Sequence, residues 1–143
     1  MSTILRLAVD VPLRQLFDYR PPPGVDARQL VPGMRLWVPF GRRRVCGVLV
    51  EISGASDVPP ARLRSATAVI DETPVLDESL LGLLRWSADY YHHPPGEVIA
   101  AALPAALRSG VSAVEQEERW ALSAAARAGE IPPLSARAGR LRE

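Results

Sequence analysis

Two apolar, strand-like runs flank a cationic turn, and this pattern limits the possible fold more than any other feature of the sequence. Apolar side chains alternate in residues 34–38, and residues 45–52 are almost continuously apolar, so both runs are typical of β-strands. Gly41 and three consecutive arginines lie between them, and glycine readily supplies the positive φ angle of a tight turn. We therefore predict a β-hairpin whose tip presents three guanidinium groups. Such a tip suits phosphate oxygens, although a run of charges is equally typical of a solvated turn.

Three further segments have strand character. Residues 4–11 contain β-branched side chains and stop at Pro12, and residues 16–20 are followed by three prolines. Residues 63–70 are consistent with a last strand. Together with the hairpin, these segments predict five short strands.

The hydrophobic period changes after residue 76. Asp77 is a typical helix N-cap, and the apolar residues after it recur at helical spacing, which predicts a helix over residues 78–91. The stripe that should face a core consists of Leu80, Leu81, Leu84, Ala88 and Tyr91. The segment 92–96, His-His-Pro-Pro-Gly, breaks this helix. Residues 97–103 then predict a short second helix, which Pro104 ends or kinks.

Five strands followed by two helices predict an α+β fold. We expect a small, partly open, OB-like β-barrel or curled sheet of about five strands, with two helices on its C-terminal side. Residues 1–108 form this domain in the prediction. Residues 109–143 are polar and rich in alanine, and they predict a linker that leads into the truncated start of a further domain.

Charge and cysteine content restrict the partners and cofactors. The net charge of +1 hides an asymmetry, because residues 1–70 carry +5 and residues 71–143 carry −4. Cys46 is the single cysteine, so we expect neither an internal disulfide nor a cysteine-based zinc site. The sequence has no apolar run of eighteen residues and no signal-peptide pattern, and we therefore expect a cytoplasmic protein without membrane contact.

Three sequence segments occur in one order and at one spacing that together are specific. They are Val-Pro-Leu at 11–13 with Phe-Asp-Tyr at 17–19, Val-Pro-Phe-Gly-Arg at 38–42 with Gly-Val at 47–48, and Trp-Ser-Ala-Asp-Tyr-Tyr at 86–91. This set resembles the N-terminal DNA-binding domain of the primosomal replication restart protein PriA family. The resemblance runs from about residue 4 to residue 104. It implies that a winged-helix domain begins within the last residues of this chain.

The resemblance also implies a function. In that family the domain captures the 3′ end of the nascent leading strand at an abandoned replication fork, and a helicase motor and a zinc-binding module lie further along the chain. The partners expected for this chain are forked DNA with a 3′-hydroxyl end, and also single-strand DNA-binding protein and other primosome components. No phosphate-binding Gly-x-x-x-x-Gly-Lys-Ser/Thr loop and no lysine occur, so we expect no ATP hydrolysis and no cofactor in this chain.

The family's 3′-end pocket corresponds to Phe17, Asp18, Gly41 and Arg64. A terminal nucleotide has a free 3′-hydroxyl and a base that can leave the stack, so its pocket needs an aromatic wall and a hydrogen-bond acceptor. A carboxylate accepts hydrogen bonds and repels a phosphate, and a glycine lets the backbone approach the sugar. The guanidinium of Arg64 stands where the family often has lysine, which changes the hydrogen bonding there. Phe17 and Asp18 are neighbours in an extended segment, so they line one pocket only where the strand ends or twists.

The arginines Arg42, Arg43 and Arg44 are expected to contact the DNA backbone. Structural roles compete with each functional one. Taken alone, an aromatic residue such as Phe17 is more often core than base platform, Asp18 suits a turn, and Gly41 suits the hairpin. The histidines 92 and 93 suit helix capping better than a metal site, because no cysteine or carboxylate pair accompanies them.

The other aromatic side chains are interpreted as packing residues. They are Trp37, Trp86, Tyr90 and Tyr91. The sequence offers no Ser-His-Asp arrangement and few general bases, so we expect a non-catalytic protein. Two other functions stay open: a protein-interaction module that docks a primosome component or single-strand DNA-binding protein, and an RNA-binding barrel.

Overall fold

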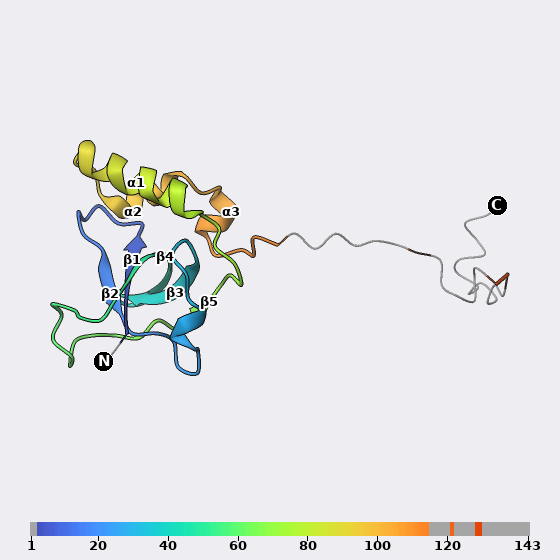
Figure 1. The fold of residues 1–143 in the computed structure, drawn as a ribbon, viewed down its shortest axis with the longest axis horizontal. Coiled ribbons are helices and arrows are strands. Elements are labelled where there is room, and N and C mark those ends of the chain that lie inside the picture. Colours follow the sequence, from blue (N-terminus) through green and yellow to red (C-terminus); the bar gives the residue numbers. More distant parts are fainter. Residues whose placement is uncertain (1–2, 115–120, 122–127, 130–143) are drawn as a thin grey trace.

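The computed structural model describes residues 3–114, 121 and 128–129. Residues 4–108 form a curled sheet with helices on one side (Figure 1). The predicted linker and further domain at 109–143 fall largely outside the described residues and stay a prediction. The elements are β1 (Ile4–Val9), β2 (Phe17–Tyr19), the 3₁₀ turn η1 (Ala27–Gln29), β3 (Arg35–Phe40), β4 (Arg43–Ser53), β5 (Ala68–Val69), α1 (Glu78–Tyr90), α2 (Pro95–Ala101) and α3 (Ala105–Arg108).

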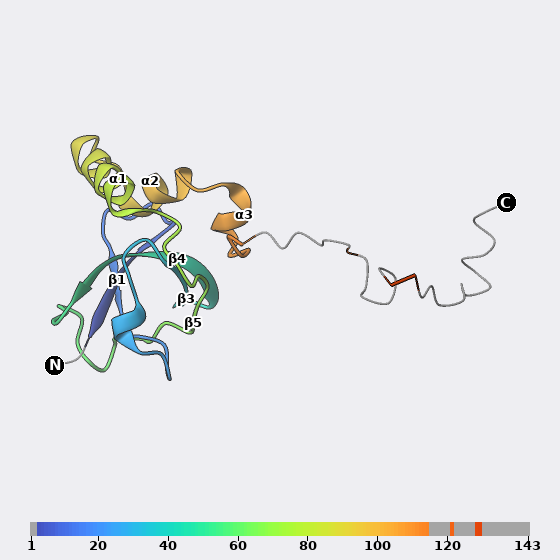
Figure 2. The same cartoon turned by 45° about the vertical axis from the view of Figure 1, so that its right-hand side comes forward.

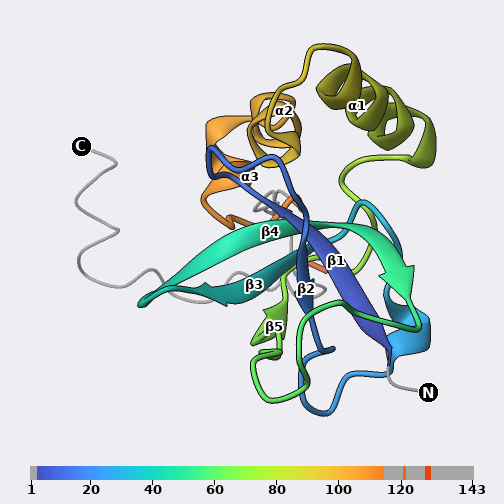
Figure 3. The same ribbon diagram turned by 90° about the vertical axis from the view of Figure 1, so that its left-hand side faces the viewer.

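The five strands form one antiparallel sheet in the order β2-β1-β4-β3-β5. The long strand β4 is strongly bent, and the neighbouring strands β1 and β3 follow its curvature (Figures 2 and 3). The two edges of the sheet approach each other at one parallel bridge between Arg20 and Ser65, while β2 and β5 do not pair. The predicted α+β fold with an open, OB-like sheet of about five strands is therefore confirmed.

The hairpin forms as predicted, but its strands extend further toward the tip. Phe40 pairs with Arg43, so the turn consists only of Gly41 and Arg42. Gly41 has a φ of 60°, whereas Arg42 is not among the described residues with positive φ, which is the pattern of a type II′ turn. Two of the three arginines expected at the tip thus belong to β4.

The almost continuous apolar character of β4 has a structural cause, since both faces of the sheet are covered. One face lines the inside of the curled sheet, where its cluster includes Leu5, Leu7, Val9, Leu36, Val38 and Leu49. The other face carries Ala8, Val48 and Val50, which pack against Leu81 of α1 and against Ile99 and Leu103. The helices therefore close a second core over the outer face of the sheet.

The predicted fifth strand shrinks to two residues. Only Ala68 and Val69 pair with β3, although residues 63–70 were expected to be a strand. Arg20 replaces the missing partners, because its amide donates to the Arg64 carbonyl and its carbonyl accepts from the Ala66 amide, at 2.8 and 2.9 Å. These bonds tie residues 64–66 to the residue that follows β2, whereas the amides of Thr67 and Ile70 still donate to carbonyls of β3.

Helix α1 begins at Glu78 as predicted, whereas α2 begins at Pro95, two residues before the predicted start, and ends at Ala101. The Asp77 carboxylate accepts from the Leu80 amide at 2.8 Å, and Pro95 is the first residue of α2. Pro104 ends the helical run, and a third short helix, α3, follows it. This third helix was not predicted, because four residues are too few to show a hydrophobic period.

Arg35 is the first residue of β3, and its side chain is fully buried. Its Nε and Nη2 atoms donate to Asp71, at 2.8 and 2.5 Å, and its Nη1 donates to the Leu107 carbonyl. The hydrogen bonds to Asp71 raise the pKa of Arg35, so the side chain stays charged inside the fold. Arg35 thereby fixes α3 to the outer face of β3. None of the helices in the described residues is long and apolar enough to cross a membrane.

Candidate nucleic-acid interface

Phe17 and Asp18 line one open hollow of about 500 Å³ at the edge of the sheet. We call it the Asp18 hollow, and it is lined by Arg6, Gln15, Leu16, Phe17, Asp18, Asp57 and Val58. The two residues point to opposite faces of β2, because Phe17 is opposite Leu7 and Asp18 is opposite Arg6. They share the hollow because β2 begins at Phe17, so the chain there is open to the loop that contains Asp57.

The Asp18 carboxylate is held by two side chains. Ser56 Oγ donates to one carboxylate oxygen at 2.5 Å, and Arg6 Nε lies 3.5 Å from the other. Arg6 also donates to Glu51 at 3.2 Å. The Asp18 side chain is 13% exposed, so it is largely enclosed and yet reaches the hollow. Each carboxylate oxygen has two acceptor sites, and the carboxylate is therefore oriented with acceptor capacity to spare.

Phe17 is both a core residue and a wall of the Asp18 hollow. Its ring meets the ring of Phe40 edge to face, with 5.1 Å between the centroids. Both rings are half-buried and pack against the core inside the sheet. The two roles that the sequence left as alternatives for Phe17 are therefore compatible.

Gly41 and Arg64 lie in contact with each other, because Arg64 Nη1 donates to the Gly41 carbonyl at 3.2 Å. Neither belongs to the residues that line the Asp18 hollow in the described part of the chain. They adjoin it through Phe40, which precedes Gly41 and contacts Phe17. A Cβ atom added at Gly41 would have nothing within 4 Å, so the backbone there is open to a ligand.

Tyr19 supports this corner from inside the sheet. Its hydroxyl donates to the Pro39 carbonyl at 3.0 Å, which ties β2 to the end of β3. Burial raises the pKa of Tyr19, and the nearby Arg64 charge partly opposes this shift. The phenol therefore stays protonated and keeps its donor role. This role of Tyr19 could not be predicted from the sequence, because its hydroxyl contact joins two segments that are not neighbours in the chain.

The three tip arginines do not form one patch. Arg42 is in the turn, while Arg43 and Arg44 are consecutive in β4 and so point to opposite faces. The Arg44 guanidinium lies over the Trp37 ring, 4.4 Å from its centroid. All three arginines are exposed, so each can meet a solvent-borne anion, but from different sides of the hairpin.

The interpretation of Trp86, Tyr90 and Tyr91 as packing residues is wrong. Their exposed fractions are 56%, 64% and 70%. The rings of Trp86 and Tyr90 are stacked, and the ring of Tyr91, which follows the last residue of α1, meets that of Tyr90 edge to face. The helix packs through Leu81, Leu84 and Ala88 only, because the stripe that faces the sheet and α2 is narrower than predicted. Leu83, Trp86, Tyr90 and Tyr91 form a second stripe, here called the aromatic stripe.

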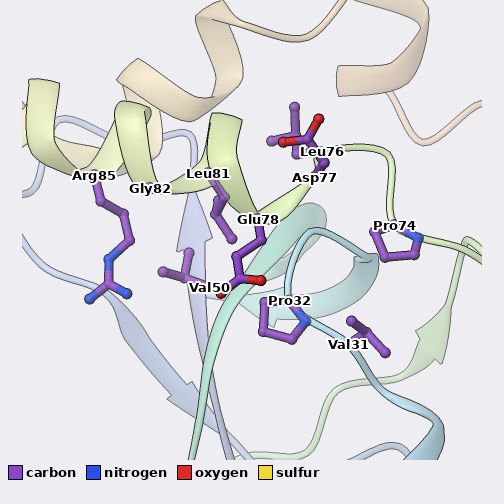
Figure 4. Close-up of a pocket in the computed structure, with 10 residues that line it drawn as sticks. All are labelled: Val31, Pro32, Val50, Pro74, Leu76, Asp77, Glu78, Leu81, Gly82 and Arg85. Atoms are coloured by element: carbon purple, nitrogen blue, oxygen red, sulfur yellow. The ribbon is translucent and has the colours of Figure 1, made fainter.

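A separate, larger hollow of about 790 Å³ lies beneath the first half of α1 (Figure 4). Its walls are mostly apolar, and the Glu78 side chain points into it between Val50 and Pro32 (Figure 4). Asp77 also lines this hollow, so the lining has two carboxylates and one cation, Arg85. The excess of carboxylates makes this hollow a poor site for phosphate.

The two histidines lie at the end of α1. His92 adopts a φ of 51°, and its Nδ1 lies 3.2 Å from Arg14 Nη2. His93 Nε2 lies 3.0 Å from Glu97 Oε2 one turn later. Across residues 3–114, 121 and 128–129, no group of three His, Cys, Asp or Glu side chains could hold a metal ion.

A known protein family and several known proteins match most of this chain in sequence. A family model described as the 3′ DNA-binding domain of PriA matches residues 6–104. The replication restart protein PriA of Haemophilus influenzae is 37% identical over 82% of this chain, and that of Bacillus subtilis is 34% identical over 71%. The matches cover 16% and 13% of those relatives, so the chain spans a small part of their length.

Proposed function

The chain belongs to the family of the PriA 3′ DNA-binding domain, and from this premise we propose that it is a non-catalytic module that binds the 3′ end of DNA. In this proposal it acts in the cytoplasm and recognises the end of the nascent leading strand at a stalled or abandoned replication fork. It thereby positions a replication restart protein that reloads the replicative helicase. The motor activity belongs to other parts of such a protein.

One observation carries the proposal: the Asp18 carboxylate is oriented by Ser56 and Arg6 in an open hollow beside Phe17. A terminal nucleotide presents a 3′-hydroxyl donor, which the carboxylate accepts. A 3′-phosphate or a continuing strand brings a negative charge to the same place, and Asp18 and Asp57 repel it. The terminal base stacks on the Phe17 side of the hollow.

The corner formed by Gly41 and Arg64 completes the proposed site. Gly41 has open space where a side chain would be, so a sugar can approach the backbone closely. The Arg64 guanidinium donates to the Gly41 carbonyl with one nitrogen and has further donors for the last phosphate. Arg42, Arg43 and Arg44 bind phosphates further along the strand.

The test measures binding of the chain to duplexes that carry a recessed 3′-hydroxyl, a 3′-phosphate or a blunt end. We expect the 3′-hydroxyl to bind most tightly, and we expect Asp18→Ala to remove this preference. The fold should survive, because Arg6 keeps its ion pair with Glu51. Asp89→Ala, which changes an exposed carboxylate on α1, is the matched control and should keep the preference. Equal affinity of the unaltered chain for all three ends would refute end recognition.

The aromatic stripe favours a second function, the docking of a protein partner. Four large apolar side chains are exposed on α1 and on the residue that follows it. Single exposed apolar residues are common on protein surfaces, but a group of this kind is typical of an interaction site. We propose single-strand DNA-binding protein or another primosome component as the partner. Purified single-strand DNA-binding protein should bind the chain in the presence of nuclease. The variant Trp86→Ala should lose this binding. Leu13→Ala, an exposed apolar residue outside the stripe, is the control.

A further inference from the structure

A cationic groove lies between the β3–β4 hairpin and α3, away from the Asp18 hollow. It is an open hollow of about 400 Å³, here called the hairpin–helix groove, and its lining is Val9, Asp10, Val11, Trp37, Phe40, Arg43, Arg44, Val45, Cys46, Arg108 and Ser109. Arg44 and Arg108 are far apart in the sequence and belong to different elements. The fold alone places them on one groove.

The position of α3 explains how Arg108 reaches this groove. The Leu107 carbonyl accepts from Arg35 Nη1 and lies 3.9 Å from Cys46 Sγ, so the end of α3 is fixed to the outer face of the hairpin. Gly110 continues this contact, because a Cβ atom there would lie 2.2 Å from the Trp37 ring. Arg108 is therefore held in place by contacts of the residue before it, Leu107, and of Gly110 two residues after it.

The charges of the groove favour an anion. Its lining contains Arg44 and Arg108 against one carboxylate, that of Asp10, and it also contains Arg43, whose side chain points to the opposite face of β4 from that of Arg44. Arg43, Arg44 and Arg108 are exposed, and within the described residues none of them belongs to an ion pair. The Trp37 ring supports the Arg44 guanidinium from below, so one donor group is oriented before a ligand arrives. Guanidinium groups present forked donors that match phosphate oxygens.

The groove also has a structural link to the Asp18 hollow. Phe40 lines the groove, and its ring contacts that of Phe17, which lines the hollow. The two sites are therefore separated by one pair of aromatic rings.

We propose that the hairpin–helix groove binds the sugar–phosphate backbone of DNA without requiring a strand end, and that Arg108 of α3 acts there together with Arg44. This inference rests on the proposed function in that the ligand is DNA. The two sites have different tasks. The Asp18 hollow discriminates between ends, whereas the groove supplies affinity that is independent of them.

Covalently closed circular duplex DNA tests the groove, because it has no ends. The unaltered chain should bind the circle, and Arg44→Gln and Arg108→Gln should each weaken this binding. The slope of log affinity against log salt is negative, and each single variant should reduce its magnitude by about one unit and the double variant by about two. Arg28→Gln, an exposed arginine on η1, is the matched control and should bind like the unaltered chain. The ratio of 3′-hydroxyl to 3′-phosphate binding should stay unchanged in all of these variants.

The outcomes separate the groove from end recognition. A chain that does not distinguish ends but loses circle binding with Arg108→Gln would refute end recognition and support the groove. The groove is refuted if the double variant binds the circle as tightly as Arg28→Gln does, or if the chain binds polyglutamate but not the circle. Arg44→Lys keeps a charge over Trp37 and should restore part of the circle binding that Arg44→Gln loses.

Discussion

Arg35 carries a charge although its side chain is fully buried, and Asp71 is the reason that the fold tolerates it. Asp71 accepts from the backbone amide of Arg35 at 3.0 Å and from two nitrogens of its guanidinium. All buried polar side-chain atoms in the described residues have a hydrogen-bond partner. A buried pair of this kind adds little net stability, but the loss of one partner leaves an uncompensated charge.

Replacing Asp71 alone should therefore be costly. We expect Asp71→Ala to lower the free energy of unfolding by about 3–5 kcal/mol, because Arg35 then lies buried without its counter-charge. Urea denaturation measures this change. Asp77→Ala, which removes the cap of α1, should cost only about 1 kcal/mol and is the control. A loss of about 1 kcal/mol or less for Asp71→Ala would contradict the role given to the pair. Arg35→Met combined with Asp71→Leu should restore much of the stability.

Some residues of the candidate site could be predicted from the sequence, and others could not. Phe17 and Asp18 could be selected from the sequence, and the structure places them in one hollow. Ser56 and Arg6 could not be selected, although they orient the carboxylate. A serine in a loop and an arginine in a strand have no distinctive pattern, and only the fold brings them next to Asp18.

At the scale of elements, the second core depends on how closely α2 approaches β1. Gly96 lies in the first turn of α2, and a Cβ atom there would be 1.7 Å from the Val9 carbonyl oxygen. A Cβ atom added at Gly82, in α1, would have nothing within 4 Å. One glycine is therefore required by packing, and the other is not.

The same substitution should have opposite effects at these two glycines. Gly96→Ala should destabilise the fold by about 1–3 kcal/mol, because α2 must move away from β1. Gly82→Ala should stabilise it by about 0.5–1 kcal/mol, since alanine loses less backbone entropy in a helix. Thermal unfolding of the two variants measures the difference. If both variants unfolded at the same temperature, the close approach of α2 and β1 would not matter to stability.

At the scale of the whole molecule, one sheet separates two cores, and α3 lies at the margin of the outer one. Leu107 is partly buried against the outer core, and its carbonyl binds Arg35. Arg35 also binds Asp71, which lies just beyond the short strand β5. The helical layer and the far edge of the sheet are thus joined through a single buried guanidinium.

Two shortened chains test this connection. A chain that ends at Ser112 keeps α3, whereas one that ends at Pro104 loses it. We expect the shorter chain to lose about 2 kcal/mol relative to the longer one, because the charged hydrogen bond of Arg35 to the Leu107 carbonyl is lost. Calorimetry compares the two, and equal unfolding temperatures would contradict this role of α3. Leu107→Ala in the unshortened chain keeps the carbonyl and should cost less.

The sequence alone determined the fold class, the hairpin and the start of α1. These features depend on interactions between residues close in the chain: strand alternation in residues 34–38, a glycine with positive φ at position 41, and the Asp77 cap. The chain order of three local motifs also carried the family resemblance, which the comparisons confirm over residues 6–104.

Only the tertiary structure decided which charges are buried, which aromatic residues are exposed and which arginines share a groove. Arg35 is buried because Asp71 and the Leu107 carbonyl meet it, Trp86 is exposed because α1 packs by a narrow face, and Arg108 adjoins Arg44 because α3 folds back. These outcomes depend on partners 36 or more residues away in the chain. Local periodicity holds no information on such contacts, because the free energy that selects them comes from burial and hydrogen bonding across the assembled fold.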